Sequence, residues 1–489
     1  MAHPATVVAN PDPSEEVVGV QQTSCCVVGG GPAGMVLALL LARRGVPVTL
    51  LEAHADFDRN FRGDTVHPAI LEILDQLGLA ERLHRIPHVK FFGPSLVTAN
   101  GPVPLFDFRR LRSRYPYLMV MPQERFLEFL ADEAAKYPHL RLTMQANVQR
   151  LVEEGGAVRG VRYRGTGGWE EIRAPLTVGA DGRFSRVRHL AGIKPLMLAG
   201  PIELLWFRLP RLPGDSQELE SVESAVRSHA GLVMNGEGES AVGFVRRGNG
   251  FLLVAFNRLD HWQIGYIYPE GTYQALKAAG IEPFRRSIID VEPRLARHLE
   301  SLTDWRQLVP LSVALSRCRR WYKPGLLLIG DAAHVMTPAA GAGIKYAIED
   351  AVETANVLAL PLRAGRVRLR DLAEVQRRRE WPTRIVQWTA AWPQRLMTRV
   401  FRSGQRPGGP PRLPLLLRLL LRLPLLRSLP AQFIGRGLWR VRVEDPSEVA
   451  GAGGPPNPYM ASEVKRHHGF PGFNVSPAAG AGEPGRVRW

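Results

Sequence analysis

The sequence predicts an α/β protein with a parallel sheet, and the first indication is a strand–helix–strand unit near its beginning. Residues 24–28 (SCCVV) form a short apolar run, and residues 35–44 form an apolar, helix-like stretch that ends at Gly45. Residues 46–52 (VPVTLLE) form a second apolar run. Glycine often follows a helix directly because it adopts the left-handed conformation without strain. Two strands joined by a helix within about thirty residues make a βαβ unit.

Two later apolar runs return to the same pattern. Residues 176–182 (LTVGADG) and 325–331 (GLLLIGD) each read as a buried strand that enters a turn. A helix is expected to follow the second run, from Gly343 to about Leu360. The other elements expected in the first half of the chain are an amphipathic helix over 68–84, a helix that starts near Pro122, and strands over 140–152 and 157–164 joined through 153–156.

The third indication is a change of texture at about residue 200. From there to about residue 315, alternating runs such as 204–209 and 262–268 mix with short helical stretches. Alternation of apolar and polar residues is typical of an antiparallel sheet with one solvated face. This region therefore reads as a second sheet, separate from the βαβ unit.

The net charge of +17 is carried mainly by the C-terminal part of the chain. Residues 361–489 contain 23 Lys and Arg against 8 Asp and Glu, whereas residues 1–360 contain 40 against 38. A nearly neutral body gives no electrostatic support for nucleic-acid binding, which needs a basic surface that faces phosphates. Only 7 of the 63 basic residues are lysine, so a coding bias towards arginine is an alternative explanation of the surplus.

Cysteine content and hydropathy indicate a cytoplasmic protein. Cys25, Cys26 and Cys318 are too few for a disulfide framework and read as small buried hydrophobes. Residues 1–22 form a polar leader, expected to be flexible, without the apolar core of a signal peptide. No run of about 18 apolar residues occurs, so a membrane-spanning helix is not expected.

A glycine-rich turn lies where the first predicted strand meets the helix. Gly29, Gly31 and Gly34 form the pattern G-x-G-x-x-G, with Pro32 and Ala33 between the last two. The first glycine permits a tight turn, the second lets the backbone approach a pyrophosphate, and the third lets helix and strand pack closely. Phosphates would then lie at the helix N-terminus, where free N–H groups and the helix dipole favour negative charge. The turn therefore predicts a dinucleotide site.

An acidic residue narrows the choice of dinucleotide. Glu52 lies 18 residues after Gly34, at the end of the second predicted strand. A carboxylate in this place accepts hydrogen bonds from the ribose hydroxyls of an adenosine. It would repel a 2′-phosphate, so the site favours FAD or NAD over NADP. The alternative is a structural turn followed by a coincidental acid.

Two further motifs favour FAD over NAD. The sequence Gly330-Asp331-Ala332-Ala333-His334 ends a predicted buried strand and is followed by Pro338, Gly341 and Gly343. Asp181-Gly182 precedes Ser185 and Arg188. With the glycine turn, these motifs occur in an order that resembles the family of flavin-dependent aromatic hydroxylases related to para-hydroxybenzoate hydroxylase. The resemblance covers about residues 22–360.

The resemblance implies a role for each matching position. Arg62, which stands 16 residues before Gly78, matches an arginine that contacts the FAD phosphates, and Gln123 matches a glutamine that opens a helix beside the cofactor. Asp331 matches an aspartate that hydrogen-bonds the ribityl chain. The segment with Asp181 and Arg188 matches one that the family uses for both FAD and the incoming pyridine nucleotide. The full set of implied cofactor-binding residues is Gly29, Gly31, Pro32, Ala33, Gly34, Glu52, Arg62, Gln123, Asp181, Gly182, Arg188, Gly330, Asp331, Gly341, Gly343, Ile344 and Lys345.

The family also implies an architecture and an activity. The expected fold is a Rossmann-type FAD-binding domain in two segments, 23–198 and 316–362, with a mixed-sheet substrate domain inserted at 199–315 and residues 91–115 as a further contributor to the substrate side. NADH or NADPH reduces the FAD, O2 gives a flavin C4a-hydroperoxide, and one oxygen atom is transferred to an aromatic or polycyclic small molecule. The expected partners are therefore this substrate and O2. No catalytic residue for the substrate can be named, because core packing explains Trp206, Phe207 and Arg208 equally well.

One position departs from the family. The family reads Gly-x-Gly-x-Asn after the Gly-Asp motif, whereas this chain reads Gly341-Ala342-Gly343-Ile344-Lys345. A positive helix end stabilises the negative charge of reduced flavin, and a lysine beside it could add to this effect or block the flavin. We favour a third interpretation, in which Lys345 points into solvent, because long lysine side chains readily reach outwards.

The remaining motifs do not change the reaction class. His334 reads as a hydrogen-bonded structural histidine rather than a base, since its neighbours are apolar. His467 and His468 lack partner ligands at metal-binding spacing, so no metal is expected. A flavin-dependent epoxidase or reductase of a lipid or isoprenoid, and a non-catalytic flavoprotein, stay open as alternatives to the hydroxylase. A halogenase is disfavoured, because the Trp-x-Trp-x-Ile-Pro motif is absent.

The C-terminal part reads as a basic helical region over 363–445, followed by a disordered tail over 446–489 that is rich in Gly, Pro and Ala. Its most unusual segment is 412–429 (RLPLLLRLLLRLPLLRSL). This segment either packs its leucines on the body as a helical hairpin, which we favour, or brings residues 412–442 into peripheral contact with a membrane.

Overall fold

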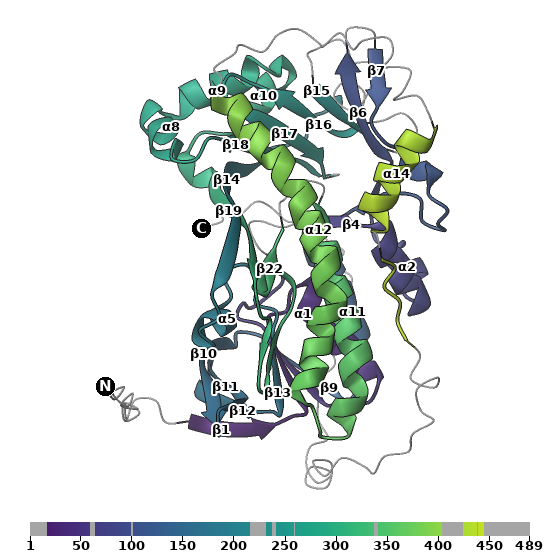
Figure 1. Ribbon diagram of the computed structural model, residues 1–489. Helices are drawn as coiled ribbons and strands as arrows, with labels where there is room; N and C mark the ends of the chain where they lie inside the picture. Colours follow the sequence, from purple (N-terminus) through teal and green to yellow (C-terminus); the bar gives the residue numbers. More distant parts are fainter. Residues whose placement is uncertain are drawn as a thin grey trace, which may run out of the picture.

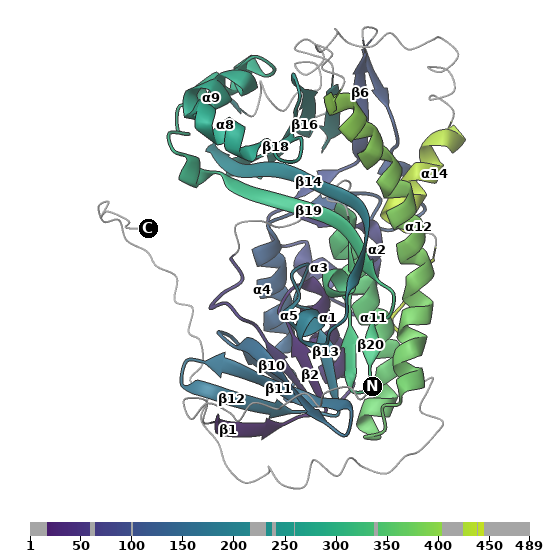
Figure 2. The same cartoon turned by 60° about the vertical axis from the view of Figure 1, so that its left-hand side comes forward.

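Two large sheets, joined by a pair of long strands, form the body of the protein (Figures 1 and 2). The computed structural model describes residues 17–58, 64–98, 101–215, 231–236, 241–258, 260–336, 341–402, 424–437 and 439–444. The α/β class with several sheets, predicted from the βαβ unit and the change of texture at residue 200, is confirmed.

The first sheet has six strands in the order β20-β21-β13-β2-β3-β9. Its strands are β2 (Cys25–Val28), β3 (Val48–Leu51), β9 (Leu140–Thr143), β13 (Leu176–Gly179), β20 (Tyr322–Lys323) and β21 (Leu326–Leu328). All pairs are parallel except β20 with β21. In register, Gly179 lies between Val28 and Leu328. The carboxyl ends of these strands therefore meet at one edge, which brings together the turns that follow them.

Three helices pack around this sheet and complete the core. They are α1 (Pro32–Arg43), α4 (Gln123–Ala134) and α11 (Ala342–Arg363), and α1 contacts both others. Residues 33–42 of α1 are buried throughout, because the helix lies between sheet and neighbouring helices. α12 (Leu369–Arg402) continues beyond α11 along the whole length of the molecule (Figure 1).

The second sheet has nine strands in the order β22-β19-β14-β18-β17-β16-β15-β6-β7. They are β22 (His334–Val335), β19 (Val309–Cys318), β14 (Pro195–Pro210), β18 (His261–Tyr268), β17 (Leu252–Asn257), β16 (Ala241–Arg247), β15 (Gly231–Asn235), β6 (Gly93–Thr98) and β7 (Gly101–Pro104). The long strands β14 and β19 run between the two halves of the molecule (Figure 2). One face packs on α8 (Tyr273–Ala279), α9 (Ile281–Ile289) and α10 (Ala296–Leu299), around a core that includes Phe207, Trp262 and Phe284.

Two smaller sheets complete the body. One has the order β1-β12-β11-β10, with β1 (Val17–Gln22), β10 (Asn147–Glu154), β11 (Ala157–Gly165) and β12 (Gly168–Arg173). The other has the order β4-β8-β5, with β4 (Thr65–Val66), β5 (Val89–Phe91) and β8 (Leu118–Val120). The remaining helices that position the site are α2 (Pro68–Gln76), α3 (Ala80–Leu83), α5 (Arg186–Leu190) and α14 (Pro424–Gly435).

Three expectations about elements were wrong. Residues 17–22 are not flexible, because they form β1 and pair in parallel with β12. The strand expected over 140–152 is two strands in different sheets, separated where Gln145 takes a positive φ of 56°. The helix expected over 68–84 is broken into α2 and α3 at Gly78, whose φ of 72° ends the first helix.

The basic C-terminal region is described in part. α12 and α14 lie within the expected region, whereas residues 403–423, and with them most of the leucine-rich segment 412–429, lie outside the described residues. The tail over 446–489 and the first 16 residues also lie outside them. Among the described helices, none combines the length and apolar character that a transmembrane span requires.

Candidate functional site

In the glycine turn between β2 and α1, backbone packing requires glycine at two of the three motif positions and leaves open space at the third. Gly29 has a φ of 107°, and a Cβ there would lie 2.6 Å from the carbonyl oxygen of Ala180. A Cβ on Gly34 would overlap the Gly29 carbonyl oxygen. Gly31, the N-cap of α1, has nothing within 4 Å of its Cβ position. A bare backbone facing open space at a helix N-terminus is the cradle that a pyrophosphate needs, so the residues present fit FAD.

Glu52 follows β3, and its carboxylate is hydrogen-bonded to the backbone of this turn. Its side chain is buried, and Oε2 accepts a 2.8 Å hydrogen bond from Gly30 N. Oε1 accepts from His54 N at 3.0 Å. His54 Nδ1 also lies 2.7 Å from Oε1. The carboxylate predicted from the sequence therefore lies beside the glycine turn.

Asp181 follows β13 at the same edge and is hydrogen-bonded to the start of α5, whose N-cap is Ser185. Its carboxylate accepts from Ser185 Oγ at 2.5 Å and from Val187 N at 3.0 Å. Burial raises the pKa of Asp181 above its usual range. Gly182 takes a φ of 80°, which lets the chain turn back into α5. In this structure Asp181 thus fixes the segment that the sequence assigned to cofactor binding.

Arg188 joins the second motif to the third. Its guanidinium donates to the carbonyl oxygen of Ala332 at 2.9 Å and to that of Arg183 at 2.8 Å. Ala332 belongs to the short turn of residues 330–332 that follows β21. Two motifs that are 150 residues apart in the sequence, at Asp181 and Asp331, are therefore tied by one side chain.

The Gly-Asp turn packs between α1 and α11. Gly330 has a φ of 58°, and a Cβ there would lie 3.2 Å from the Ala347 methyl group and 3.3 Å from that of Ala33. Asp331 lies at the start of α11, since a Cβ on Gly343 would be 4.0 Å from its Oδ1. Burial raises the pKa of Asp331, although His334 and Arg183 oppose that shift. The turn thus lies against both helices whose N-termini can face the cofactor.

The N-terminus of α11 is formed by a left-handed glycine that a histidine holds. Gly341, with a φ of 61°, is the N-cap, and Gly343 and Ile344 lie in the first turn. The Gly341 carbonyl oxygen lies 3.2 Å from His67 Nε2, while His67 Nδ1 lies 3.1 Å from the carbonyl oxygen of Ile434 in α14. His67 is fully buried. Sequence reasoning missed this residue, because its two partners lie far away in the chain.

The interpretation that Lys345 points into solvent was wrong. The residue is 1% exposed, and its Nζ lies 3.1 Å from Glu349 Oε1. The ammonium also lies 4.3 Å from the centre of the Tyr346 ring. Burial lowers the pKa of Lys345, and Glu349 opposes that shift. Its ion pair with Glu349, one turn further along α11, directs the charge away from the first turn of the helix.

Lys345 is one end of a buried chain of charged side chains that we call the α11–α12 network. Glu349 also accepts from Arg379 at 2.8 Å, and Arg379 donates to Asp350 at 2.8 Å. Asp350 accepts from His334 at 2.6 Å and from Gly330 N at 3.0 Å. The network therefore runs from α11 and α12 to the Gly-Asp turn. His334 is buried and hydrogen-bonded, as predicted, and its role as a structural residue rather than a base stays a prediction.

For two predicted cofactor residues, Gln123 and Arg62, the structure gives no contact that would place them at the cofactor. Gln123 is the first residue of α4, which packs on α1, so it opens a helix as expected. Arg62 lies outside the described residues, as does Pro338. Contact of either Gln123 or Arg62 with the cofactor stays a prediction.

The nine-stranded sheet presents a half-buried aromatic face opposite the helices α8–α10. Trp206 and Phe256, on β14 and β17, lie 6.3 Å apart on this face. Phe207 points the other way, into the core, where it lies 6.0 Å from Phe284. Arg208 is exposed. Core packing thus explains Phe207, whereas Trp206 is half-buried on the opposite face.

Arg258 is a charged residue that sequence reasoning missed. It follows β17, is 7% exposed, and forms an ion pair with Asp64 beside β4. Its Nε and one terminal nitrogen are buried without a hydrogen-bond partner among the described residues. Burial lowers the pKa of Arg258 to about 9, which leaves the guanidinium charged at neutral pH. Asp64 precedes Thr65, whose Oγ1 lies 3.4 Å from the Gly341 carbonyl oxygen, so Arg258 lies near the N-terminus of α11.

Metal ions and reactive thiols have no support in the described part of the chain. No group of three or more potential metal ligands occurs there. Cys25 and Cys26 are fully buried on β2, and burial raises the pKa of Cys26 to about 12. A buried thiol of high pKa is a poor nucleophile.

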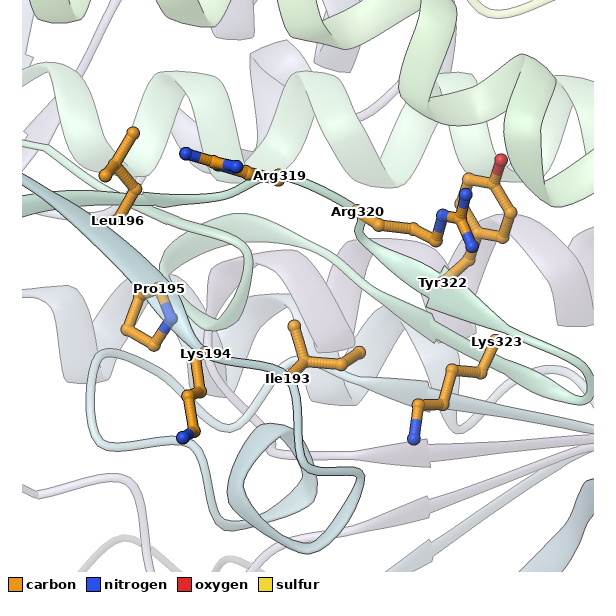
Figure 3. A pocket seen from close by; sticks show the side chains of 8 residues that line it. All are labelled: Ile193, Lys194, Pro195, Leu196, Arg319, Arg320, Tyr322 and Lys323. Carbon is orange, nitrogen blue, oxygen red and sulfur yellow. The ribbon is translucent and has the colours of Figure 1, made fainter.

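A solvent-open groove lies outside this constellation (Figure 3). It has a volume of about 730 Å³ and lies between residues 193–196 and 319–323. None of the predicted cofactor residues lines it. The candidate FAD site itself is defined by the strand ends and the α1 cradle.

Comparison with known proteins identifies the family of this site. Residues 22–389 match the family described as FAD binding domain. The chain belongs to this family. It is 35% identical to the 6-methylpretetramide 4-monooxygenase of Streptomyces rimosus over 72% of this chain and 78% of that protein. It is 28% identical to the rifampicin monooxygenase of Streptomyces venezuelae over 66% of this chain and 61% of that protein.

Solved structures share the fold of this FAD-binding protein. PqsL of Pseudomonas aeruginosa has a TM-score of 0.61 at 21% identity, over 78% of this chain and 99% of that one. The OxyS anhydrotetracycline hydroxylase of Streptomyces rimosus has a TM-score of 0.60 at 22% identity, over 85% of this chain and 76% of that one. The resemblance read from the three motifs is therefore confirmed, and the protein is an FAD-dependent oxidoreductase of the monooxygenase class.

Proposed function

We propose that this protein hydroxylates an oxygen-bearing aromatic or polycyclic small molecule, with O2 as oxidant and NADH or NADPH as reductant. The observation that carries the proposal is the convergence of Gly31, Glu52 and Asp331 at one edge of the parallel sheet in a chain of the FAD-binding family. In the overall reaction, substrate, O2, NAD(P)H and a proton give hydroxylated substrate, NAD(P)+ and water. Bound FAD supplies the redox chemistry.

The chain's own residues would hold the cofactor and the substrate. The N–H groups at the start of α1 face the pyrophosphate, Glu52 the ribose, and Asp331 the ribityl chain. The N-terminus of α11 presents a positive helix end to the flavin ring. We infer that residues 23–198 and 316–362 act as the cofactor domain, and that residues 199–315 together with 91–115 act as the substrate side.

Arg258 supports a substrate that carries an anionic or enolic oxygen. A buried guanidinium with unpaired N–H groups is costly unless an acceptor completes it. A phenolate or enolate oxygen supplies that acceptor, and Trp206 and Phe256 offer aromatic surface nearby. Two relatives from Streptomyces rimosus have names that agree with this substrate class. They are the 6-methylpretetramide 4-monooxygenase and the 12-dehydrotetracycline 5-monooxygenase/anhydrotetracycline 6-monooxygenase.

Lipid epoxidation is the second candidate, and relatives favour it to a smaller extent. The chain is 26% identical to the squalene monooxygenase of Mus musculus over 66% of this chain and 52% of that protein. A hydrocarbon, however, would leave the Arg258 N–H groups unpaired. The buried cation therefore favours the oxygen-bearing aromatic.

The test is an oxygenation assay on the purified holoprotein. We expect a flavin spectrum, and NAD(P)H oxidation in air that polycyclic phenols stimulate and squalene does not. Labelled dioxygen should place one labelled oxygen atom in the product. Bound flavin that no reduced pyridine nucleotide reduces, with or without phenols, would contradict the proposal and support a non-catalytic flavoprotein. Stimulation by squalene alone would support the epoxidase.

A further inference from the structure

Both walls of the open groove are anchored to the turn that carries the Gly-Asp motif. One wall, residues 193–196, begins directly after α5, and Ile193 N donates to the carbonyl oxygen of Arg188 at 3.1 Å. Arg188 in turn holds Ala332 through its guanidinium. The other wall, residues 319–323, follows β19, where Cys318 N donates to the carbonyl oxygen of Ala333 at 2.8 Å. The groove is thus connected through two short paths to the candidate FAD site.

The rim of the groove carries only positive charge. Lys194, Arg319, Arg320 and Lys323 line it and are exposed, and no Asp or Glu lines it. None of these four forms an ion pair with a carboxylate within the described residues. Arg319 and Arg320 also line the adjoining depression, where Glu380 pairs with Arg384 at 3.5 Å. In Figure 3, Lys194 and Lys323 extend on the same side of the two walls. Arg319 and Arg320 extend away from these two lysines, in opposite directions. Four cations around one concave surface without an opposing carboxylate attract phosphate groups.

The floor of the groove is apolar and includes one aromatic ring. Ile193, Pro195, Leu196 and Tyr322 supply it, and the Arg320 guanidinium lies 5.8 Å from the centre of the Tyr322 ring. Leu196 is 39% exposed, so it presents apolar surface at the groove. An apolar floor with a cationic rim fits a molecule that combines flat rings with phosphates.

The proposed reaction needs such a molecule and a second place to bind it. The α1 cradle holds one dinucleotide, and Glu52 beside it opposes a 2′-phosphate. We propose that the groove between residues 193–196 and 319–323, hereafter the basic groove, binds the phosphates and the adenine end of reduced NADPH. This inference rests on the proposed function, because it places the reductant of that reaction. The volume of about 730 Å³ is within the range of small-molecule and cofactor sites.

The test is a binding measurement that does not depend on turnover. FAD-loaded protein is titrated with oxidised NADP+ by calorimetry, for the wild type and for the double variant Arg320→Glu/Lys323→Glu. Each cation that contacts a phosphate contributes about tenfold in affinity, so the double variant should bind NADP+ at least about tenfold more weakly. Raising the ionic strength should weaken wild-type binding in the same direction.

The matched control reverses two cations that lie away from the groove. Lys277 on α8 and Arg286 on α9 are exposed on the helices that cover one face of the nine-stranded sheet (Figure 2). The double variant Lys277→Glu/Arg286→Glu has the same change in net charge, so it should bind NADP+ within about twofold of wild type if general electrostatics contribute little. FAD content and melting temperature of both variants should match wild type, because all four side chains are at the surface.

The outcomes separate this inference from the proposed function. Equal loss of NADP+ affinity in both double variants, or no loss in either, would overturn the basic groove as the site. Unchanged NADP+ affinity with lost adsorption to vesicles of anionic phospholipid in the groove variant would also overturn it, in favour of a membrane contact. Failure of the proposed function has a different signature: wild-type holoprotein that binds NADP+ through the groove yet oxidises no NADPH with any aromatic substrate. A raised KM for NADPH with unchanged kcat in the groove variant supports both.

Discussion

The Lys345 ammonium lies 3.1 Å from the Glu349 carboxylate in the interior of the protein, and Arg379 from α12 donates to the same carboxylate at 2.8 Å. Two buried cations therefore share one buried anion. Arg379 also donates to Asp350, so the two cations and two carboxylates balance. The arrangement explains how this chain holds a lysine close to the start of α11, where its family has an asparagine, without directing a charge into the flavin site.

The first prediction follows from the position of the Glu349 carboxylate between the two cations, Lys345 and Arg379. Glu349→Leu leaves Lys345 and Arg379 buried with one carboxylate between them, and breaking a buried pair costs about 3–5 kcal/mol. Lys345→Met leaves Glu349 paired with Arg379, so it should cost clearly less. Urea unfolding of both variants measures the difference. If Lys345→Met is the more destabilising of the two, the charge balance described here is wrong.

A second prediction separates the glycines of the turn. Gly34→Ala places a methyl group on the Gly29 carbonyl oxygen, so the protein without FAD should lose stability. Gly31→Ala meets nothing within 4 Å, so the same measurement should show a change below about 1 kcal/mol. FAD affinity should nevertheless fall in Gly31→Ala, because the methyl group occupies the space for the pyrophosphate. Normal FAD affinity in Gly31→Ala would show that the pyrophosphate does not lie against this turn.

These two cases show what could be predicted from the sequence. The roles of Gly29, Gly31 and Gly34 depend on a strand and a helix that are adjacent in the chain, so a local pattern carries them. Lys345 was misread because its environment depends on Arg379, which lies 34 residues later, and on the turn after α14, where a Cβ on Gly437 would lie 2.7 Å from Nζ. Local sequence contains Glu349 as a possible partner but not the helix that buries both.

Other features that the sequence does not predict also depend on contacts between distant segments. The sequence predicts a continuous strand over 140–152, because apolar and polar residues alternate through both pieces. Only tertiary structure assigns β9 and β10 to different sheets. Arg258 belongs to no motif in the sequence, and its unpaired N–H groups become visible only when the sheet brings it to Asp64. Residues whose role depends on distant partners are those that the sequence did not assign.

A third prediction concerns acid stability. The pKa of Asp350 is held below its ordinary value of 3.8, against the opposing effect of burial, by His334 and Arg379. A carboxylate with a depressed pKa in the folded state contributes stability that is complete above the unfolded value and is lost as the pH falls through the folded value. We therefore expect Asp350→Asn to be less stable than wild type at neutral pH, with a gap that narrows below pH 3.8.

The same substitution should also affect the cofactor. Asp350 accepts from Gly330 N, so its loss loosens the turn that positions Asp331. Flavin fluorescence reports FAD release, and chemical unfolding between pH 3 and pH 7 reports the stability gap. A gap that stays constant over this range would show that Asp350 does not contribute through its charge. The matched control is Asp304→Asn, at the surface before Trp305, which should leave FAD affinity unchanged.

The last prediction tests the substrate side at Arg258. Arg258→Lys keeps a positive charge for Asp64 but removes the planar fork of N–H donors, which lysine does not replace. KM for a polycyclic phenol should rise by about tenfold or more, since a hydrogen bond to a charged group contributes about 1.5–3 kcal/mol. The FAD spectrum and the oxidation of NADPH without substrate should change little, because Arg258 belongs to the sheet side of the site. For an aromatic compound without a hydroxyl group, binding should be equal in variant and wild type, and an equal loss for both ligands would show that Arg258 shapes the sheet rather than recognising oxygen.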